Sequence, residues 1–111
     1  MKVKTIDNTR SVEMLPGIFR KTLVYDEDGM LCHFFLKEGS TIPLHDHEAT
    51  QLGFVLSGRI EFMSESEEDT TIVDEGASYI IPGGVKHGAR MIEDSRIIEC
   101  FVPSRPEYYN E

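Results

Sequence analysis

The sequence predicts an all-β fold in which short strands form a sandwich or a barrel. Runs of β-branched and aromatic residues recur along the chain, turns with glycine or proline separate them, and no segment shows helical periodicity of useful length. A jelly roll suits this length, because it closes two sheets over one core and so protects their edge strands. A chain of 111 residues also predicts one domain, over residues 1–111, with one hydrophobic core.

The first strands are expected between residues 18 and 47. The sequence Asp-Glu-Asp-Gly at residues 26–29 is a turn signal, and it predicts a hairpin between strands at residues 18–25 and 30–36. A third short strand follows over residues 41–47. Pro43 within it suits an edge strand or a bulge, because proline cannot donate a hydrogen bond to a central ladder.

Strands of similar length continue to residue 102. Ser57 and Gly58 form a tight turn between two of them, and the acidic stretch at residues 64–69 is interpreted as a solvated hairpin tip. Pro103 ends the last strand. The predicted strands of this half cover residues 51–56, 59–63, 70–73, 78–81, 87–92 and 96–102.

The charge of the chain excludes two classes of partner. Eleven lysines and arginines stand against 20 aspartates and glutamates, so the net charge is −9. A chain this acidic, without a basic cluster, is a poor candidate for binding nucleic acid or an anionic membrane, and an anionic ligand would need a local positive site. No apolar run has membrane-spanning length and the N-terminus lacks a signal-like segment, so we expect a cytoplasmic protein. Cys32 and Cys100 are then expected to be reduced thiols packed in strands.

Three histidines have a spacing that is typical of a metal site. Residues i and i+2 of a strand point to the same face, so His45 and His47 are expected to aim both imidazoles into one space. Neutral imidazole is a common ligand of transition metals. A turn at Pro82 and Gly84 precedes His87, and it can return the chain so that His87 faces the other two histidines.

These residues belong to two glycine-framed motifs that resemble those of the cupin superfamily. The resemblance implies a cupin jelly-roll β-barrel (a double-stranded β-helix) with a metal in its mouth, often in a homodimer. The motifs are Gly39-x5-His45-x-His47-x3-Gln51-x6-Gly58 and Gly76-x5-Pro82-x-Gly84-x2-His87.

The resemblance also implies a ligand set for one divalent transition metal ion, which could be zinc, nickel, manganese or iron. The implied ligands are His45, His47, Gln51 and His87. Gln51 replaces the usual glutamate, so the four ligands are neutral and leave the ion its full charge, which favours an anionic, oxygen-rich ligand.

Two further residues of the barrel region are not expected to bind the metal. Met91 stands where many cupins have asparagine, and it is interpreted as barrel lining. His33 lies in an apolar run and fits no motif, so it is interpreted as structural, or as a pocket wall at most.

The last strand carries residues suited to a small sugar acid. Glu99 and Phe101 share one face by the two-residue period, and Arg105 follows just past the strand end, where a guanidinium fork can clamp a carboxylate. Glu99 would supply an acid/base group and Phe101 an apolar wall. The alternative is that Glu99 pairs with Arg105 or another arginine and that Phe101 is core.

This C-terminal pattern, with Gln51, is similar to one cupin subgroup that acts in pectin and alginate breakdown. The resemblance implies non-redox conversion of 4,5-unsaturated uronates into open-chain keto acids, with Glu99, Phe101 and Arg105 as the catalytic residues. The subgroup usually has aspartate at the position of Glu99. Two other hypotheses remain: a cupin dioxygenase acting on a small organic substrate, and a non-catalytic cupin that binds a sugar or effector.

Overall fold

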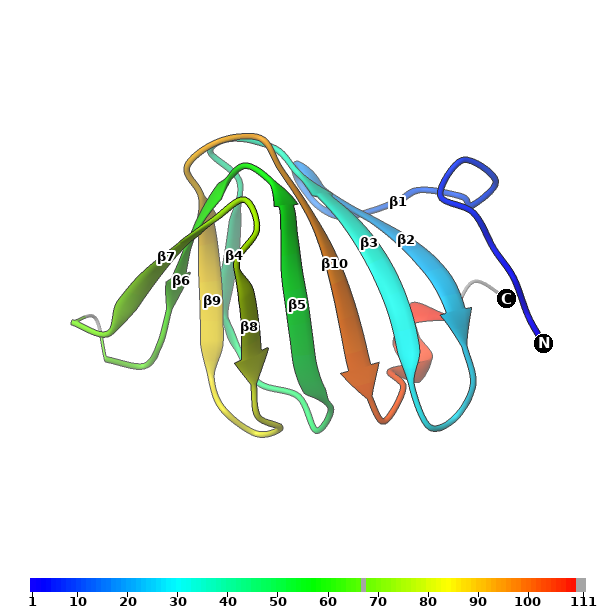
Figure 1. Ribbon diagram of the computed structural model, residues 1–111. Coiled ribbons are helices and arrows are strands. Elements are labelled where there is room, and N and C mark those ends of the chain that lie inside the picture. Colours follow the sequence, from blue (N-terminus) through cyan, green and yellow to red (C-terminus); the bar gives the residue numbers. More distant parts are fainter. Residues whose placement is uncertain (67, 110–111) are drawn as a thin grey trace.

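The computed structural model describes residues 1–66 and 68–109, and in this part of the chain one short 3-10 helix accompanies ten strands. The strands form two antiparallel sheets that face each other (Figure 1). The larger sheet has the order β1-β2-β3-β10-β5-β8, and the smaller one β4-β9-β6-β7. The elements are β1 (Val12–Leu15), β2 (Ile18–Tyr25), β3 (Met30–Leu36), β4 (Thr41–His45), β5 (Thr50–Ser57), β6 (Arg59–Met63), β7 (Thr70–Asp74), β8 (Ser78–Ile81), β9 (His87–Met91), β10 (Ser95–Val102) and the 3-10 helix η1 (Pro106–Tyr108).

This architecture confirms the all-β jelly roll that the sequence predicts. The hairpin at residues 26–29 closes as expected, with the Asp26 amide donating to the Gly29 carbonyl over 3.0 Å. Pro43 lies in β4, which is an edge strand of the smaller sheet, as predicted. Residues 64–69 join β6 to β7 as predicted, although residue 67 lies outside the described residues.

Three elements of the structure differ from what the sequence predicts. β4 ends at His45, whereas the sequence predicts a strand to residue 47. β1 was not predicted, and it is added to the edge of the larger sheet by pairing with β2. η1 was not predicted either, because its placement depends on a long-range contact in which the Thr22 hydroxyl donates to the Tyr108 carbonyl over 2.6 Å.

The core fills the space between the two sheets. Inward positions alternate along β10, so that Ile97, Glu99 and Phe101 are buried, as the two-residue period predicts. The same alternation in β5 buries Gln51 and Val55. Glu99 and Gln51 are therefore polar side chains placed inside a mainly hydrophobic core, and they need polar partners there.

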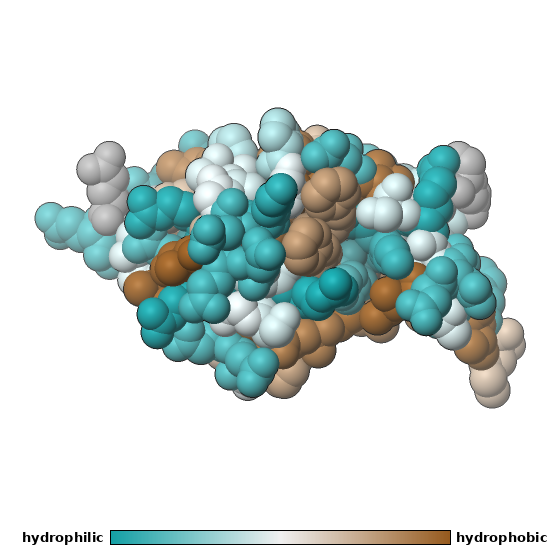
Figure 2. Space-filling model, turned by 90° about the horizontal axis from the view of Figure 1, so that it is seen from above, coloured by the Kyte–Doolittle hydropathy of each residue, from teal (hydrophilic) through white to brown (hydrophobic). Residues whose placement is uncertain are grey.

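Hydrophilic side chains cover most of the face seen from above, with hydrophobic ones in smaller patches (Figure 2). Both cysteines are free thiols in strands, as predicted, and burial raises the pKa of Cys32 to about 11. In residues 1–66 and 68–109, no helix is long and apolar enough to cross a membrane.

Candidate metal centre in the barrel

Three histidines converge at one end of the barrel. His45 ends β4 and His87 begins β9, and the two residues are partners in the ladder that joins these strands. His47 lies two residues beyond the end of β4, so strand alternation does not position it as the sequence predicts. The loop does so instead, because the Gly84 amide donates to the His47 carbonyl over 2.8 Å. One ring nitrogen of each histidine lies within 4.8 Å of the others.

Backbone hydrogen bonds set the tautomer of all three imidazoles. Each Nδ1 lies against a carbonyl oxygen two residues away: Pro43 for His45 (2.9 Å), Ala49 for His47 (2.7 Å) and Val85 for His87 (2.9 Å). A carbonyl only accepts, so Nδ1 carries the proton and Nε2 keeps a lone pair. This orienting bond is typical of histidines that bind metals.

Burial further favours the neutral, ligating form of two of these imidazoles. It lowers the pKa of both His47 and His87, because the charged form loses its hydration. The Nε2 atom of His87 is buried and has no hydrogen-bond partner among the described residues. A buried lone pair without a donor is what a metal ligand presents before its ion binds.

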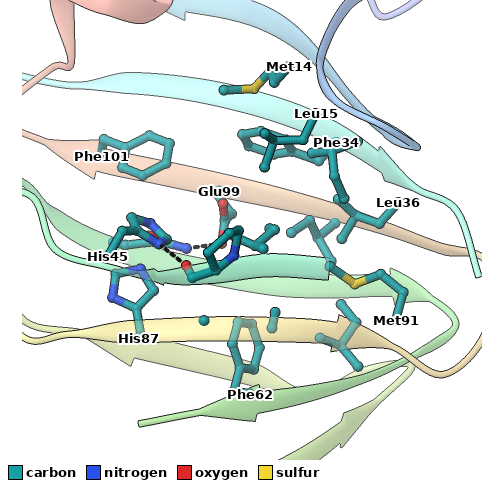
Figure 3. A pocket seen from close by; sticks show the side chains of 18 of the residues that line it. Met14, Leu15, Phe34, Leu36, His45, Phe62, His87, Met91, Glu99 and Phe101 are labelled. Atoms are coloured by element: carbon teal, nitrogen blue, oxygen red, sulfur yellow. Dashed lines mark hydrogen bonds between the residues drawn. The ribbon is translucent and has the colours of Figure 1, made fainter. Parts of the chain in front are cut away.

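Gln51 completes a donor set that fits a cation. Its Oε1 lies 3.0 Å from the Nε2 of His47. Its amide Nε2 donates to Glu99 Oε2, and Figure 3 marks this bond with a dashed line at Glu99. With Nδ1 of His47 protonated, two acceptors therefore face each other, an arrangement that a bound cation satisfies. The three histidines could therefore hold one metal ion, and Gln51, the fourth predicted ligand, lies beside His47.

His45 and His87 open into a cavity of about 270 Å³ between the sheets (Figure 3). Its wall is mainly apolar, and its polar groups lie near the histidines. Met91 lines it, as the sequence predicts, whereas His33 does not and lies in a separate hollow beside Lys21 and Arg96. The side chains that line the cavity include Met14, Phe34, Leu36, Ile60, Phe62, Ile97, Gln51, Glu99, Phe101, Arg105 and Tyr108.

Glu99 is a buried carboxylate that accepts two hydrogen bonds from neutral side chains. The Tyr79 hydroxyl donates to its Oε2 over 2.6 Å, and Gln51 donates to the same oxygen. No ion pair of Glu99 occurs in the part of the chain that the structure describes, so the alternative pairing with Arg105 is not seen. Burial raises the pKa of Glu99 to about 7, although the hydrogen bonds from Tyr79 and Gln51 and the charge of Arg105 act in the opposite direction.

Arg105 is held at the cavity by aromatic rings. Its guanidinium carbon lies 4.1 Å from the ring centre of Tyr108 and 5.1 Å from that of Phe101. Its Nη2 lies 3.6 Å from the Glu107 carboxylate, and its buried Nε has no partner among the described residues. Arg105 therefore offers hydrogen-bond donors at the cavity. Phe101 is both core and cavity wall, since it is buried and lines the same space.

Sequence reasoning missed Tyr108 and Tyr79. Tyr108 lies in a tail that showed no strand or helix pattern. Packing against Phe34, Phe101, Arg20 and Arg105, together with the hydrogen bond from Thr22, places it at the cavity. Tyr79 occupies an inward position of β8, which alternation predicts. Its contact with Glu99 has no signal in the sequence, because 20 residues separate the two.

A family comparison agrees with this architecture. Residues 32–102 match the family of the Cupin domain, and this match covers more than half of the chain. The protein therefore belongs to the cupins, as its two motifs indicate. A search of curated proteins found no match.

Solved structures extend the similarity over nearly the whole chain. An RmlC-like cupin from Shewanella frigidimarina has a TM-score of 0.90 at 20% identity, covering 98% of this chain and 96% of that one. KdgF from Halomonas sp. has a TM-score of 0.88 at 27% identity, covering 97% of this chain and 100% of that one. The polyketide cyclase RemF from Streptomyces resistomycificus has a TM-score of 0.79 at 21% identity, covering 96% and 82%.

Proposed function

We propose that the protein is a metal-dependent enzyme that opens and ketonises 4,5-unsaturated uronate sugars without redox chemistry. The observation that carries this proposal is one cavity in which His45, His87, Gln51, the buried Glu99 carboxylate and Arg105 meet. Among the described residues, Glu99 forms no ion pair and the buried Nε of Arg105 has no hydrogen-bond partner. The resemblance of the C-terminal residues to uronate-converting cupins supports the choice of substrate. The similarity to the structure of KdgF is consistent with it.

The metal would be held by His45, His47, Gln51 and His87. A divalent ion bound there supplies Lewis acidity toward oxygen atoms of the substrate, and the neutral ligands leave its charge undiminished. The histidines are already oriented for this task, because their Nδ1 atoms are tied to backbone carbonyls.

Arg105 binds the substrate carboxylate. Stacking on Tyr108 and Phe101 orients its guanidinium, and a planar fork suits a carboxylate better than the point charge of a lysine does. This local positive charge supplies the attraction that a chain of net charge −9 lacks. Phe101 packs against the sugar and excludes water from the reacting carbons.

Glu99 transfers the proton that completes the isomerisation. Ring opening breaks the bond between C1 and the ring oxygen, the anomeric hydroxyl loses a proton as the aldehyde forms, and the released enol gains a proton at C4 as it becomes a ketone. Atoms and electrons balance within the sugar, so no oxidant is needed. Glu99 delivers the proton to C4 as general acid and regains one afterwards.

The assay follows the ultraviolet absorbance of the substrate double bond with purified, metal-loaded protein. We expect its loss to be faster than the spontaneous rate, and Glu99→Gln should slow it by about a hundredfold or more. Loss at only the spontaneous rate would refute the proposal. Oxygen consumption by the iron-loaded protein would instead support a dioxygenase, and binding without turnover would support a non-catalytic protein.

Elemental analysis tests the ligand set separately. His45→Ala and His87→Ala should each lower the metal content of the purified protein, because each removes one of the converging Nε2 atoms. His33→Ala is the matched control, since this histidine lies outside the cavity and should leave the metal content unchanged. Unchanged content in the first two variants would refute the assignment.

A further inference from the structure

We propose that Tyr79 is a positioning residue, which fixes the Glu99 carboxylate and through it turns the Gln51 amide oxygen toward the metal. This inference rests on the metal site of the proposed function. It goes beyond that proposal because Tyr79 does not line the cavity and acts only through another side chain.

The hydrogen bonds give Glu99 two oxygens with different surroundings. Tyr79 and Gln51 both donate to Oε2, and Oε1 accepts no hydrogen bond from the described part of the chain. Burial and the nearby Glu99 charge raise the pKa of Tyr79, so its hydroxyl remains a donor. Oε2 therefore orients the Tyr79 and Gln51 side chains, and Oε1 is left to contact a ligand in the cavity.

Gly53 has no side chain, and the Tyr79 ring crosses over it to reach Glu99. Tyr79, Gly53 and Glu99 are register partners on three adjacent strands, β8, β5 and β10. A Cβ atom at Gly53 would lie 2.0 Å from Cζ of Tyr79 and 2.3 Å from its hydroxyl oxygen. The ring therefore lies directly over the glycine, and no larger residue fits beneath it. The Phe62 ring, 4.7 Å away between centroids, packs against it.

The orientation of the Gln51 amide depends on this carboxylate. A carboxylate oxygen only accepts, so Gln51 must present its NH₂ group to Glu99, and its oxygen then faces Nε2 of His47. The flipped amide would place its oxygen against Glu99. By fixing the carboxylate, Tyr79 keeps Gln51 in the only orientation that offers an oxygen to a metal.

The test compares zinc affinity among variants of the metal-free protein. Tyr79→Phe removes only the hydroxyl and should weaken zinc binding about tenfold, measured by competition with a chromophoric chelator. Gly53→Ala should weaken it similarly although the hydroxyl remains, because the added methyl displaces the ring. The double variant should bind zinc no more weakly than the weaker of the two single variants, since both changes break one contact.

Matched controls separate this role from general destabilisation. Tyr25→Phe changes a tyrosine that stacks on Tyr109 outside the cavity, and Gly29→Ala adds a methyl whose nearest neighbour is 3.6 Å away. Both should keep wild-type zinc affinity. In Tyr79→Phe, turnover of unsaturated uronate should fall in kcat about tenfold with KM changed less than about twofold, because Arg105 still binds substrate.

The outcomes distinguish this inference from the proposed function. If the wild type binds zinc and Tyr79→Phe has a dissociation constant within about twofold of the wild-type value, the role of Tyr79 is overturned. The proposed metal site is not affected by that result. The same loss in the two controls also overturns it, because the effect would then be structural. A wild-type protein that binds no metal overturns the metal site and this inference together.

Discussion

At the scale of single residues, the length of the Glu99 side chain is matched to its surroundings. Its carboxylate reaches Tyr79 on β8 and Gln51 on β5, and both neighbours donate to the same oxygen. The resembling uronate cupins usually have aspartate here. In this chain the glutamate side chain reaches both of its donors, so Glu99 is part of a local hydrogen-bonded arrangement.

Shortening this side chain should therefore lower the catalytic rate, although aspartate keeps the acid function. Glu99→Asp withdraws the carboxylate from Tyr79 and Gln51, and we expect kcat on unsaturated uronate to fall by about tenfold or more. Steady-state kinetics with the metal-loaded variant measures this. A variant as active as the wild type would show that the contacts of Glu99 do not matter for turnover.

The role proposed for Arg105 depends on the planar shape of its guanidinium group. Replacing it by lysine keeps the charge but removes the planar fork that stacks on Tyr108. We expect Arg105→Lys to raise KM for the uronate about tenfold or more, since a charge-assisted hydrogen bond contributes about 1.5–3 kcal/mol. Arg59→Lys is the control, because Arg59 is exposed and pairs with Asp74 away from the cavity. Equal KM values in all three proteins would contradict substrate binding by Arg105.

At the scale of elements, the turns hold the strands in the register that the site requires. Gly58 has φ +99° between β5 and β6, and a Cβ there would lie 2.2 Å from Ser95 Oγ and 2.5 Å from the Asp94 carbonyl oxygen. Both the backbone conformation and the close approach exclude larger residues. This turn thus joins a strand of the larger sheet to one of the smaller sheet.

Gly58→Ala should lower the free energy of unfolding by about 2 kcal/mol or more, because it adds backbone strain to a steric clash. Urea denaturation of the metal-free protein measures the change. Gly29→Ala serves as the comparison, since its methyl would meet only ordinary contacts. A Gly58 variant as stable as the Gly29 variant would contradict the steric argument.

His33 lies on the outer face of β3, away from the cavity, and its titration bears on the stability of the fold. Burial lowers the pKa of His33, and the positive charges of Arg96 on β10 and Lys21 on β2 lower it further. A lowered pKa in the folded state means that its contribution to stability is complete above the unfolded value of about 6.5 and is lost as the pH falls toward the folded value.

His33→Gln should consequently lose less stability than the wild type when the pH falls from 7.5 to 5.5. Urea denaturation with a chelator present measures both proteins, and the other three histidines remain in each. Parallel stability profiles would show that His33 titrates normally in the folded protein.

At the scale of the whole molecule, the candidate centre joins both sheets. His45 and His87 belong to the smaller sheet, whereas Gln51 and Glu99 belong to the larger one. A metal bound by ligands from both sheets links them across the core, and it binds the folded state in preference to the unfolded chain. Its removal should therefore affect the stability of the entire fold.

Zinc at about 100 times its dissociation constant should stabilise the protein by about 2.7 kcal/mol, and a chelator should lower the melting temperature by about 10 °C. Thermal denaturation followed by circular dichroism measures the shift. His87→Ala should melt at the same temperature with and without zinc. A wild-type protein that does not respond to zinc would contradict a metal shared between the sheets.

The sequence predicted those features that depend on local periodicity and on motif spacing. Strand alternation placed Glu99 and Phe101 on the inward face of β10, and the two glycine-framed motifs predicted that His45, His47 and His87 meet. It predicted His47 for a wrong reason, because a loop and not a strand holds that residue. The three histidines still converge, because the Gly84 amide of the second motif holds the loop that carries His47.

Patterns within short stretches of chain predicted the all-β class, the cupin motifs and the convergence of His45, His47 and His87. The partner that each buried polar group receives depends instead on tertiary packing. Tyr79 meets Glu99 across Gly53, and Arg105 stacks on Tyr108. Such contacts arise from the register of strands and from the folding back of the tail, and these depend on how the sheets pack and not on any local pattern.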